Sequence, residues 1–261
     1  MAIRIHLDVD AALREGETIA LPEARVHYLR NVMRRSVGDR IRVFNHEAGE
    51  FDAEISALGK KAGDVTMGAL RRAPRPAMTA LHLLVAQVKR SPMETIIQKA
   101  TELGVERIQP LITDRTNASG FNRDRCAAIA LEAAEQCERL SVPAVLERRS
   151  LADMLDRDFD DPKMGVLFCD EAGDDETAPW GGDAGRAAPM LNAIRDMASP
   201  PSSAAVLIGP EGGFSPQERR RLRETPNVFP VSLGPRILRA DTAVVAALTL
   251  WQAACGDWRA P

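Results

Sequence analysis

Residues Leu207–Ser215 have the sequence LIGPEGGFS, in which an apolar run leads into a turn rich in glycine and proline. Residues 215–218, SPQE, follow as a capping box, the pattern that starts a helix. A second apolar run leads into residues Leu233–Thr242, LGPRILRADT, where the turn carries two arginines beside an apolar pair. Glycines at the carboxyl end of a strand let backbone groups approach a ligand closely. Either turn alone indicates only a connection, but the two together predict a binding site.

From Leu81 onward, strand-like and helix-like patterns alternate around these two turns. Leu81–Val88 is almost continuously apolar, as expected of a strand buried on both faces. Further strands are expected at Arg107–Thr113, Ala144–Arg148, Met164–Asp170, Ala204–Gly209 and Val228–Leu233. Helices are expected from Ser91, which is the predicted cap, to Gly104, and at Asp124–Leu140, Leu151–Asp156, Leu191–Met197, Pro216–Arg223 and Asp241–Ala254. The alternation predicts an α/β fold with a mostly parallel sheet, interrupted by an exposed loop at Ala172–Pro189.

The first 72 residues have a different pattern. Arg40–Asn45, Glu50–Ala57 and Asp64–Leu70 alternate apolar and polar side chains, the period of half-buried strands, and a helix is expected near His27–Arg35. The basic, proline-punctuated sequence RRAPRPAM follows at residues 71–78. We therefore predict a small β-barrel domain over residues 1–72, a linker over 73–78 and a second domain over 79–261.

Charge is unevenly distributed over the 261 residues, which carry a net charge of −3 from 34 basic and 37 acidic side chains. Between Arg25 and Arg42 there are six arginines (Arg25, Arg30, Arg34, Arg35, Arg40 and Arg42) and one acid, Asp39. A local basic patch in an acidic chain suggests contact with a polyanion, although a solvated helix face explains the charge equally well. The chain as a whole is not a polycation.

Several classes of protein and site are not indicated. The sequence contains no GxGxxG, GxxxxGK[ST], HExxH or GxSxG motif, so dinucleotide, P-loop, zincin and serine-hydrolase sites have no support. The four histidines do not cluster at metal-ligand spacing, so we expect no metal. No apolar window is long enough for a membrane helix, no secretory signal is visible, and four scattered cysteines fit a reducing cytoplasm.

LIGPEGGFS and LGPRILRADT resemble the loops of SPOUT-class methyltransferases and, more narrowly, of the RsmE family, which methylates N3 of a uridine in 16S ribosomal RNA. Met93–Val105, Pro110–Arg115 and Glu132–Pro143 share this resemblance, and Leu21–Ile55 resembles the family's PUA-like RNA-binding domain. Two positions depart from the family pattern, because Glu138 stands where glycine is common and Asp241 where glutamate is common.

The resemblance implies a C-terminal SPOUT α/β domain tied in a deep trefoil knot, preceded by a PUA-like β-barrel. It also implies a homodimer that binds S-adenosylmethionine between the two glycine turns. The cofactor-binding residues carried over from the motifs are Leu207, Ile208, Gly209, Gly213, Leu233, Gly234, Ile237 and Leu238. The apolar helix over Ala243–Ala254 would form knot core or dimer surface, and core is the safer interpretation.

The chemistry of such a reaction selects candidate catalytic residues. Uracil N3 carries a proton at neutral pH, so the enzyme must favour the uracil anion, and a guanidinium can stabilise it. Arg236 is the first candidate. Glu211, the acid of the GPEGG turn, is a candidate base, although it could equally shape the loop or leave the proton to water.

Ribosomal RNA in the small subunit is the expected partner. The residues predicted to hold RNA are Arg25, Arg30, Arg34, Arg35, Arg115, Arg139 and Arg239. A helix at Asp124–Leu140 would place Glu132, Gln136 and Arg139 on one face, which is either part of the RNA cleft or a solvated face. A SPOUT enzyme acting on transfer RNA, a small-molecule transferase and a non-catalytic RNA-binding module remain alternatives.

Overall fold

The computed structural model describes residues 3–8, 13–74, 80–117, 120–157, 164–170, 187–197 and 203–259. Its contacts divide the chain into two compact units. The N-terminal unit comprises Met1–Pro76 together with Ala134–Val142, and the C-terminal unit comprises Ala77–Ala133 and Pro143–Pro261. A short segment from the middle of the chain therefore belongs to the first unit, which the sequence did not indicate.

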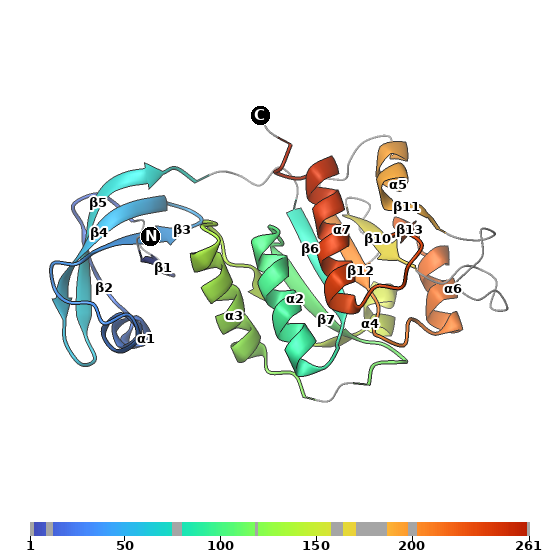
Figure 1. Cartoon of the computed structure of the whole chain (residues 1–261), viewed down its shortest axis with the longest axis horizontal. Coiled ribbons are helices and arrows are strands. Elements are labelled where there is room, and N and C mark those ends of the chain that lie inside the picture. The colour runs from blue at the N-terminus through green and yellow to red at the C-terminus, as the bar shows by residue number, and fades with distance from the viewer. Residues whose placement is uncertain are drawn as a thin grey trace. The chain divides into compact units, whose positions relative to one another are not determined.

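The N-terminal unit is built on a five-stranded sheet with the order β1-β3-β4-β5-β2 (Figure 1). Its strands are β1 (Arg4–His6), β2 (Thr18–Ala20), β3 (Arg40–Asn45), β4 (Gly49–Leu58) and β5 (Gly63–Arg72). All pairs are antiparallel except β1 with β3. The three predicted strands are confirmed as β3, β4 and β5. The sequence missed β1 and β2, whose three residues are too short to establish a period.

Alternate residues of these strands form the core of the N-terminal unit. Val43, Ile55 and Val65 are fully buried, and the helix α1 (Glu23–His27) adds the buried Val26. A π-helical turn, η1 (Tyr28–Val32), continues α1. The helix predicted near residues 27–35 thus begins earlier and ends earlier. It begins after Pro22, which occupies the N-cap position, and it has ended before Arg34, whose φ of 51° is incompatible with a right-handed helix.

The C-terminal unit contains an eight-stranded sheet with the order β11-β13-β10-β12-β6-β7-β8, in which β9 also pairs with β7. Every pair is parallel, as predicted. The strands are β6 (Ala80–Ala86), β7 (Arg107–Ile112), β8 (Ala144–Val145), β9 (Arg149–Ser150), β10 (Met164–Cys169), β11 (Ala188–Pro189), β12 (Ser203–Ile208) and β13 (Val228–Ser232). The strand predicted at 144–148 is wrong beyond Val145, and most of the predicted loop 172–189 lies outside the described residues.

The helices of this unit follow the predicted alternation, with differences at their ends. They are α2 (Arg90–Glu102), α3 (Arg123–Gln136), α4 (Leu151–Arg157), α5 (Met190–Asp196), α6 (Pro216–Glu224) and α7 (Ala240–Ala254). The capping box at Ser215 is confirmed. Lys89, not Ser91, is the N-cap of α2, and no side chain caps that helix. The helix predicted to reach Leu140 ends at Gln136, because Glu138 has a φ of 63°.

Helix α7 packs beside α2, and Figure 1 shows the two in front of the sheet. One face of α7 is buried, including Val244, Leu248 and Trp251. Each described helix is either too short or too polar to cross a membrane. Since β10, β12 and β13 are parallel neighbours, their carboxyl ends meet at one edge of the sheet, and α7 begins just after the loop that leaves β13.

Candidate functional site

A cavity lies where these three strands end, and both glycine turns contribute to its wall. The space at this site, counted together with open solvent at its mouth, is about 590 Å³. Its lining residues are Cys169, Asp170, Ile208, Gly209, Pro210, Glu211, Val231, Ser232, Leu233, Gly234, Arg236, Ile237, Leu238, Ala240 and Ala243. We call it the switch-edge pocket, because it lies beyond the carboxyl ends of a parallel sheet.

The fold brings most of the predicted cofactor-binding and catalytic residues to this pocket. Six of the eight predicted cofactor contacts line it, as do both candidate catalytic residues: Ile208, Gly209, Leu233, Gly234, Ile237 and Leu238, with Arg236 and Glu211. The other two predicted cofactor contacts, Leu207 and Gly213, do not line the pocket. Leu207 is fully buried within the sheet, and Gly213 lies in the turn beyond the lining with a φ of 67°.

At two positions of the pocket wall, the structure shows why the residue is glycine. A Cβ atom at Gly209 would lie 2.7 Å from the ring of Phe214, which itself packs edge-on against Phe168 at 5.1 Å between centroids. Gly234 has a φ of 112°, in the region that side chains with a Cβ rarely adopt. The first turn therefore needs glycine for space and the second needs it for backbone conformation.

Asp170 is the charged residue of the pocket lining that the sequence did not indicate. It directly follows β10 and is only 4% exposed. Arg219 Nε donates to its Oδ1 at 2.9 Å, and Arg223 Nη2 donates to its Oδ2 at 2.8 Å. The sequence does place an acidic residue at the end of the strand predicted at Met164–Asp170, and this position could have drawn attention to it. Because both carboxylate oxygens accept guanidinium donors, Asp170 is held in place at the pocket wall.

Arg236 and Glu211 are exposed at the same pocket. Within the described ranges, no acidic side chain forms an ion pair with Arg236, so its guanidinium is available to an anionic ligand. Asp170 and Glu211 are the acids among the lining residues. Asp170 is engaged by two arginines, whereas no ion pair of Glu211 is found among the described residues.

The arginines predicted to hold RNA lie in different environments. Arg30, Arg34 and Arg239 are exposed, and Arg35 is exposed beside Asp39 at 3.8 Å. Arg115 is also exposed, but its Nη1 donates to the carbonyl oxygen of Gly212 at 3.0 Å. These five arginines are divided between the units. Three belong to the N-terminal unit, and Arg115 and Arg239 belong to the C-terminal unit.

Arg25 and Arg139 instead take part in contacts inside the N-terminal unit. Arg25 Nη2 lies 3.0 Å from Glu135 Oε1, and the two side chains are only 14% and 10% exposed. Arg139 follows the end of α3, and its Nη2 donates to Ser141 Oγ at 2.9 Å. The interpretation of Arg139 as part of a helical stripe is wrong, because the helix ends before it. Arg25 is largely buried, and its guanidinium is paired with Glu135.

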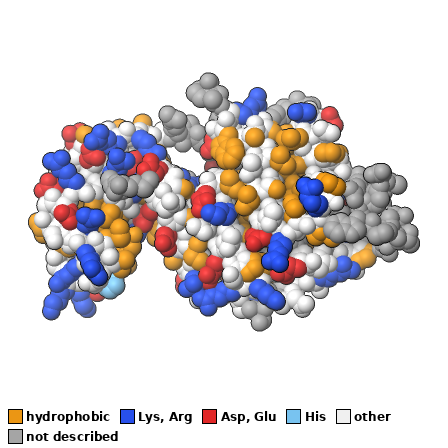
Figure 2. Space-filling model, viewed as in Figure 1, with side chains coloured by type: hydrophobic (Ala, Val, Ile, Leu, Met, Phe, Trp, Pro, Cys, Tyr) orange, Lys and Arg blue, Asp and Glu red, His pale blue; other side chains and the backbone are white. Residues whose placement is uncertain are grey.

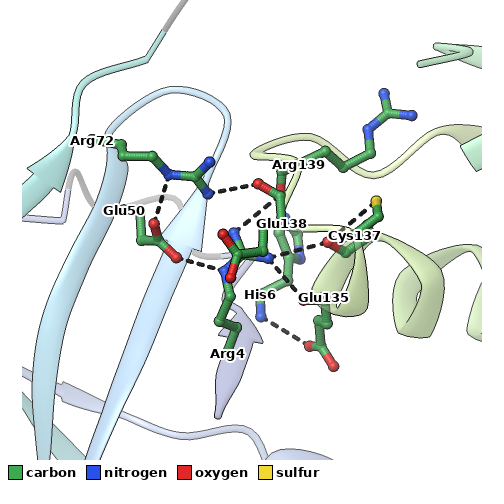
Figure 3. A network of polar contacts seen from close by, with 9 residues as sticks. Arg4, His6, Glu50, Arg72, Glu135, Cys137, Glu138 and Arg139 are labelled. Carbon is green, nitrogen blue, oxygen red and sulfur yellow. Dashed lines mark hydrogen bonds and ion pairs between the residues drawn. The ribbon is translucent and has the colours of Figure 1, made fainter. Parts of the chain in front are cut away.

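A partly buried polar network, drawn in Figure 3, includes Arg4, Glu50 and Arg72 and reaches the backbone of Arg139. Arg4 and Arg72 both donate to Glu50, and both also donate to backbone carbonyls in residues 134–139. Burial raises the pKa of Glu50, but hydrogen bonds and charge from the two arginines outweigh it, so the net shift is downward. Burial raises the pKa of Glu135 despite its pairing with Arg25. This network joins residues 134–142 to the sheet of the N-terminal unit.

A second cavity lies at the start of α2, and its polar groups are already paired. Arg125 and Arg90 both donate to Glu94, at 2.5 and 2.8 Å, and the bond from Arg125 is the main reason that the pKa of Glu94 falls to about 2. Gln87 donates to the carbonyl of Gly120 and accepts from Arg148. In contrast, Arg236 at the switch-edge pocket forms no ion pair with any acid in the part of the chain that the structure describes. Among the described residues, no group of three or more His, Cys, Asp and Glu side chains could hold a metal ion.

Comparisons with known proteins match both units. The RNA methyltransferase domain family matches residues 75–252, and the RNA methyltransferase PUA domain family matches residues 21–67. Ribosomal RNA small subunit methyltransferase E of Rickettsia conorii is 32% identical over 92% of this chain and 91% of its own length. The enzyme of the same name from Bacillus subtilis is 30% identical over 91% and 90%.

A solved structure extends this similarity to the fold. Ribosomal RNA small subunit methyltransferase E of Neisseria gonorrhoeae, bound to S-adenosyl methionine, is 27% identical, with a TM-score of 0.82 over 99% of this chain and 100% of that one. The predicted fold class, a mostly parallel α/β domain preceded by a separate PUA-like sheet domain, is confirmed. With the pocket at the sheet edge and relatives matched over nearly their whole length, the chain belongs to the ribosomal RNA small subunit methyltransferase E family.

Proposed function

We propose that this protein transfers a methyl group from S-adenosylmethionine to N3 of a uridine in 16S ribosomal RNA of the small subunit. The observation that carries the proposal is the switch-edge pocket, where two glycine turns meet in a chain of this family. Beside them lies an exposed Arg236, which has no ion pair among the described residues. The relative from Neisseria gonorrhoeae binds S-adenosyl methionine, which supports the choice of donor.

The residues of the pocket fit this cofactor. Ile237, Leu238 and Leu233 provide an apolar wall for the adenine, and the backbone of the two turns offers N–H and C=O groups to its edge and to the ribose. The bound donor would supply an electrophilic methyl group on a sulfonium.

Arg236 and Glu211 would prepare the acceptor. Uracil N3 becomes a good nucleophile only after losing its proton, and the resulting charge spreads onto O2 and O4. Arg236 stabilises that charge electrostatically. Glu211 accepts the N3 proton, because Asp170 is occupied by Arg219 and Arg223.

The exposed arginines of the N-terminal unit would hold the RNA backbone. Arg30, Arg34 and Arg35 lie on or just after η1, and Arg40 begins β3. Guanidinium groups pair with phosphates without reading sequence, so this surface contributes affinity. Arg239, exposed at the N-cap of α7, would hold a phosphate near the pocket. A ribosomal RNA substrate also implies a cytoplasmic protein.

We further propose that the protein is a homodimer that uses the outer face of α7. Val245, Ala246 and Leu250 give this face an apolar character, with Val245 36% exposed, and Ile237 nearby is 59% exposed. Figure 2 shows hydrophobic side chains gathered over α7. A contiguous apolar patch of this kind marks an interaction surface, and a second copy would cover it. We also expect the trefoil knot that the SPOUT resemblance implies.

Mass mapping of 16S ribosomal RNA from cells with and without this gene tests the function. We expect one uridine to lose a methyl group in the deletion and regain it when the wild-type gene, but not an Arg236→Ala gene, is supplied. An unchanged 16S map, or a missing methyl group in transfer RNA instead, would overturn the proposal.

A further inference from the structure

The outer side of the GPEGG turn is held by the turn that follows β7. Arg115 Nη1 donates to the carbonyl oxygen of Gly212 at 3.0 Å, and Ser215 Oγ donates to Asp114 Oδ2 at 2.5 Å. The two turns are about a hundred residues apart in the chain, and β6 lies between their strands in the sheet. These bonds therefore connect strand ends that are not neighbours.

Glu218 completes this connection with both of its carboxylate oxygens. Its Oε2 accepts from the backbone N–H of Ser215 at 2.9 Å, the usual bond of a capping box. Its Oε1 accepts from the backbone N–H of Asp114, also at 2.9 Å. The side chain is 9% exposed. One carboxylate thus serves the helix start and the neighbouring turn at once, a role that a capping box alone does not require.

The stem of Arg115 also lies against the glycine turn. A Cβ atom at Gly212 would lie 3.5 Å from Arg115 Cβ and 3.8 Å from its Cδ, both at ordinary contact distance. The same turn presents Gly209, Pro210 and Glu211 to the switch-edge pocket. Its inner side faces the pocket while its outer side is bonded to residues 114 and 115, so the position of the pocket wall depends on these bonds.

We propose that Arg115 and Glu218 are positioning residues of the cofactor pocket, acting through the backbone of the GPEGG turn. Neither lines the pocket in this structure. The inference rests on the proposed function insofar as the pocket binds S-adenosylmethionine. It assigns Arg115 a different role from the phosphate contact that its charge and exposure suggest.

Two substitutions separate the roles of these residues. Arg115→Ala removes the bond to Gly212 and leaves the capping box intact. Glu218→Gln retains the size of the side chain, but a glutamine has one acceptor oxygen, so its NH₂ group must face one of the two N–H donors. Arg195→Ala, which removes an exposed arginine of α5, is the matched control for loss of charge.

Calorimetric binding of S-adenosylmethionine to the full chain is the main measurement. We expect Arg115→Ala to weaken binding about 5-fold, because it removes one charge-assisted hydrogen bond. We expect Glu218→Gln to weaken binding about 10-fold, because one buried hydrogen bond is lost. Arg195→Ala should bind as the wild type does. Circular dichroism and thermal unfolding show whether each variant is folded.

A second measurement tests whether Arg115 contacts an RNA phosphate instead. It is the salt dependence with which the protein binds isolated small ribosomal subunits. Loss of a phosphate contact reduces the slope of log Kd against log salt by about 1, whereas loss of a positioning residue leaves it unchanged. We expect an unchanged slope for Arg115→Ala. Wild-type affinity for the cofactor in both folded variants, or a reduced slope for Arg115→Ala at unchanged cofactor affinity, overturns the inference. If the wild type itself fails to bind the cofactor, the proposed function fails first.

Discussion

Arg4 Nε donates to Glu50 Oε1 at 2.5 Å, and the two side chains are only 2% and 1% exposed. Arg72 Nε approaches the other carboxylate oxygen at 2.7 Å. Arg4 Nη1 reaches the carbonyl oxygens of Ala134 and Glu135 in the last turn of α3, where carbonyls lack partners within a helix, and its Nη2 reaches the carbonyl oxygen of Arg139. The buried pair thus also caps a helix that is 130 residues away in the chain.

Removing the charge of Glu50 should strongly destabilise the N-terminal unit. In Glu50→Gln, Arg4 stays buried without its counter-charge, which typically costs about 3–5 kcal/mol. Asp52→Asn is the control, because Asp52 lies on the same strand and pairs with Arg71 at 2.7 Å on the surface. That exposed pair should contribute about 0–1 kcal/mol. Urea unfolding at pH 7 measures both, and equal effects would contradict the role of burial.

The same pair should make stability depend on acid pH. The pKa of Glu50 lies below its ordinary value of 4.5, so the folded state binds this proton less readily than the unfolded state does. Its contribution is fully present above about pH 4.5 and is lost as the pH falls through the lowered value. The stability difference between wild type and Glu50→Gln should therefore shrink below pH 4.5. A difference that stays constant down to pH 3 would contradict this prediction.

Arg236→Ala should lower turnover strongly while retaining cofactor binding. Loss of one group that stabilises developing charge typically lowers kcat by about 10²–10³-fold. Apolar and backbone groups dominate the rest of the pocket wall, so we expect the Kd for S-adenosylmethionine to change by less than about 3-fold. Single-turnover methylation of small ribosomal subunits measures the first quantity and calorimetry the second. Full activity in this variant would remove Arg236 from the mechanism.

Gly209→Ala should damage the pocket, whereas Gly212→Ala should not. The new Cβ at position 209 would lie 2.7 Å from Phe214 Cε2, while the nearest atom to a Cβ at position 212 is 3.5 Å away. Overpacking of the first kind typically costs about 1–3 kcal/mol. We expect lower thermal stability and weaker cofactor binding for Gly209→Ala alone. Adding Phe214→Leu should restore part of both, since it removes the clashing ring.

Arg25→Ala and Arg30→Ala should separate a structural arginine from an RNA contact. Arg25 pairs with the largely buried Glu135, so its removal should lower the free energy of unfolding. Arg30 is exposed on η1, so its removal should leave stability unchanged and reduce the salt slope of RNA binding by about 1. Denaturant unfolding and binding titrations at several salt concentrations measure the two effects. Equal RNA-binding defects in stable proteins would contradict the distinction.

Short-range pattern predicted much of this structure correctly. The strand at Arg40–Asn45 has the bounds expected from its alternation, and the capping box at Ser215 starts α6 as expected. Helix ends were predicted less well. Lys89 rather than Ser91 precedes α2, and Glu138 takes a positive φ where continued helix was expected. These ends depend on the surrounding fold, because residues distant in sequence supply the partners of the free backbone groups.

The amino-acid sequence by itself determined the α/β alternation, the parallel sheet and the two glycine turns with Arg236 and Glu211, because each depends on local period and turn chemistry. Only the tertiary structure decided which charged side chains remain available. Asp170 with Arg219, and Arg25 with Glu135, are pairs formed by residues far apart in the chain. Folding brings such groups together and removes them from water, and no local pattern records which arginine will meet which carboxylate.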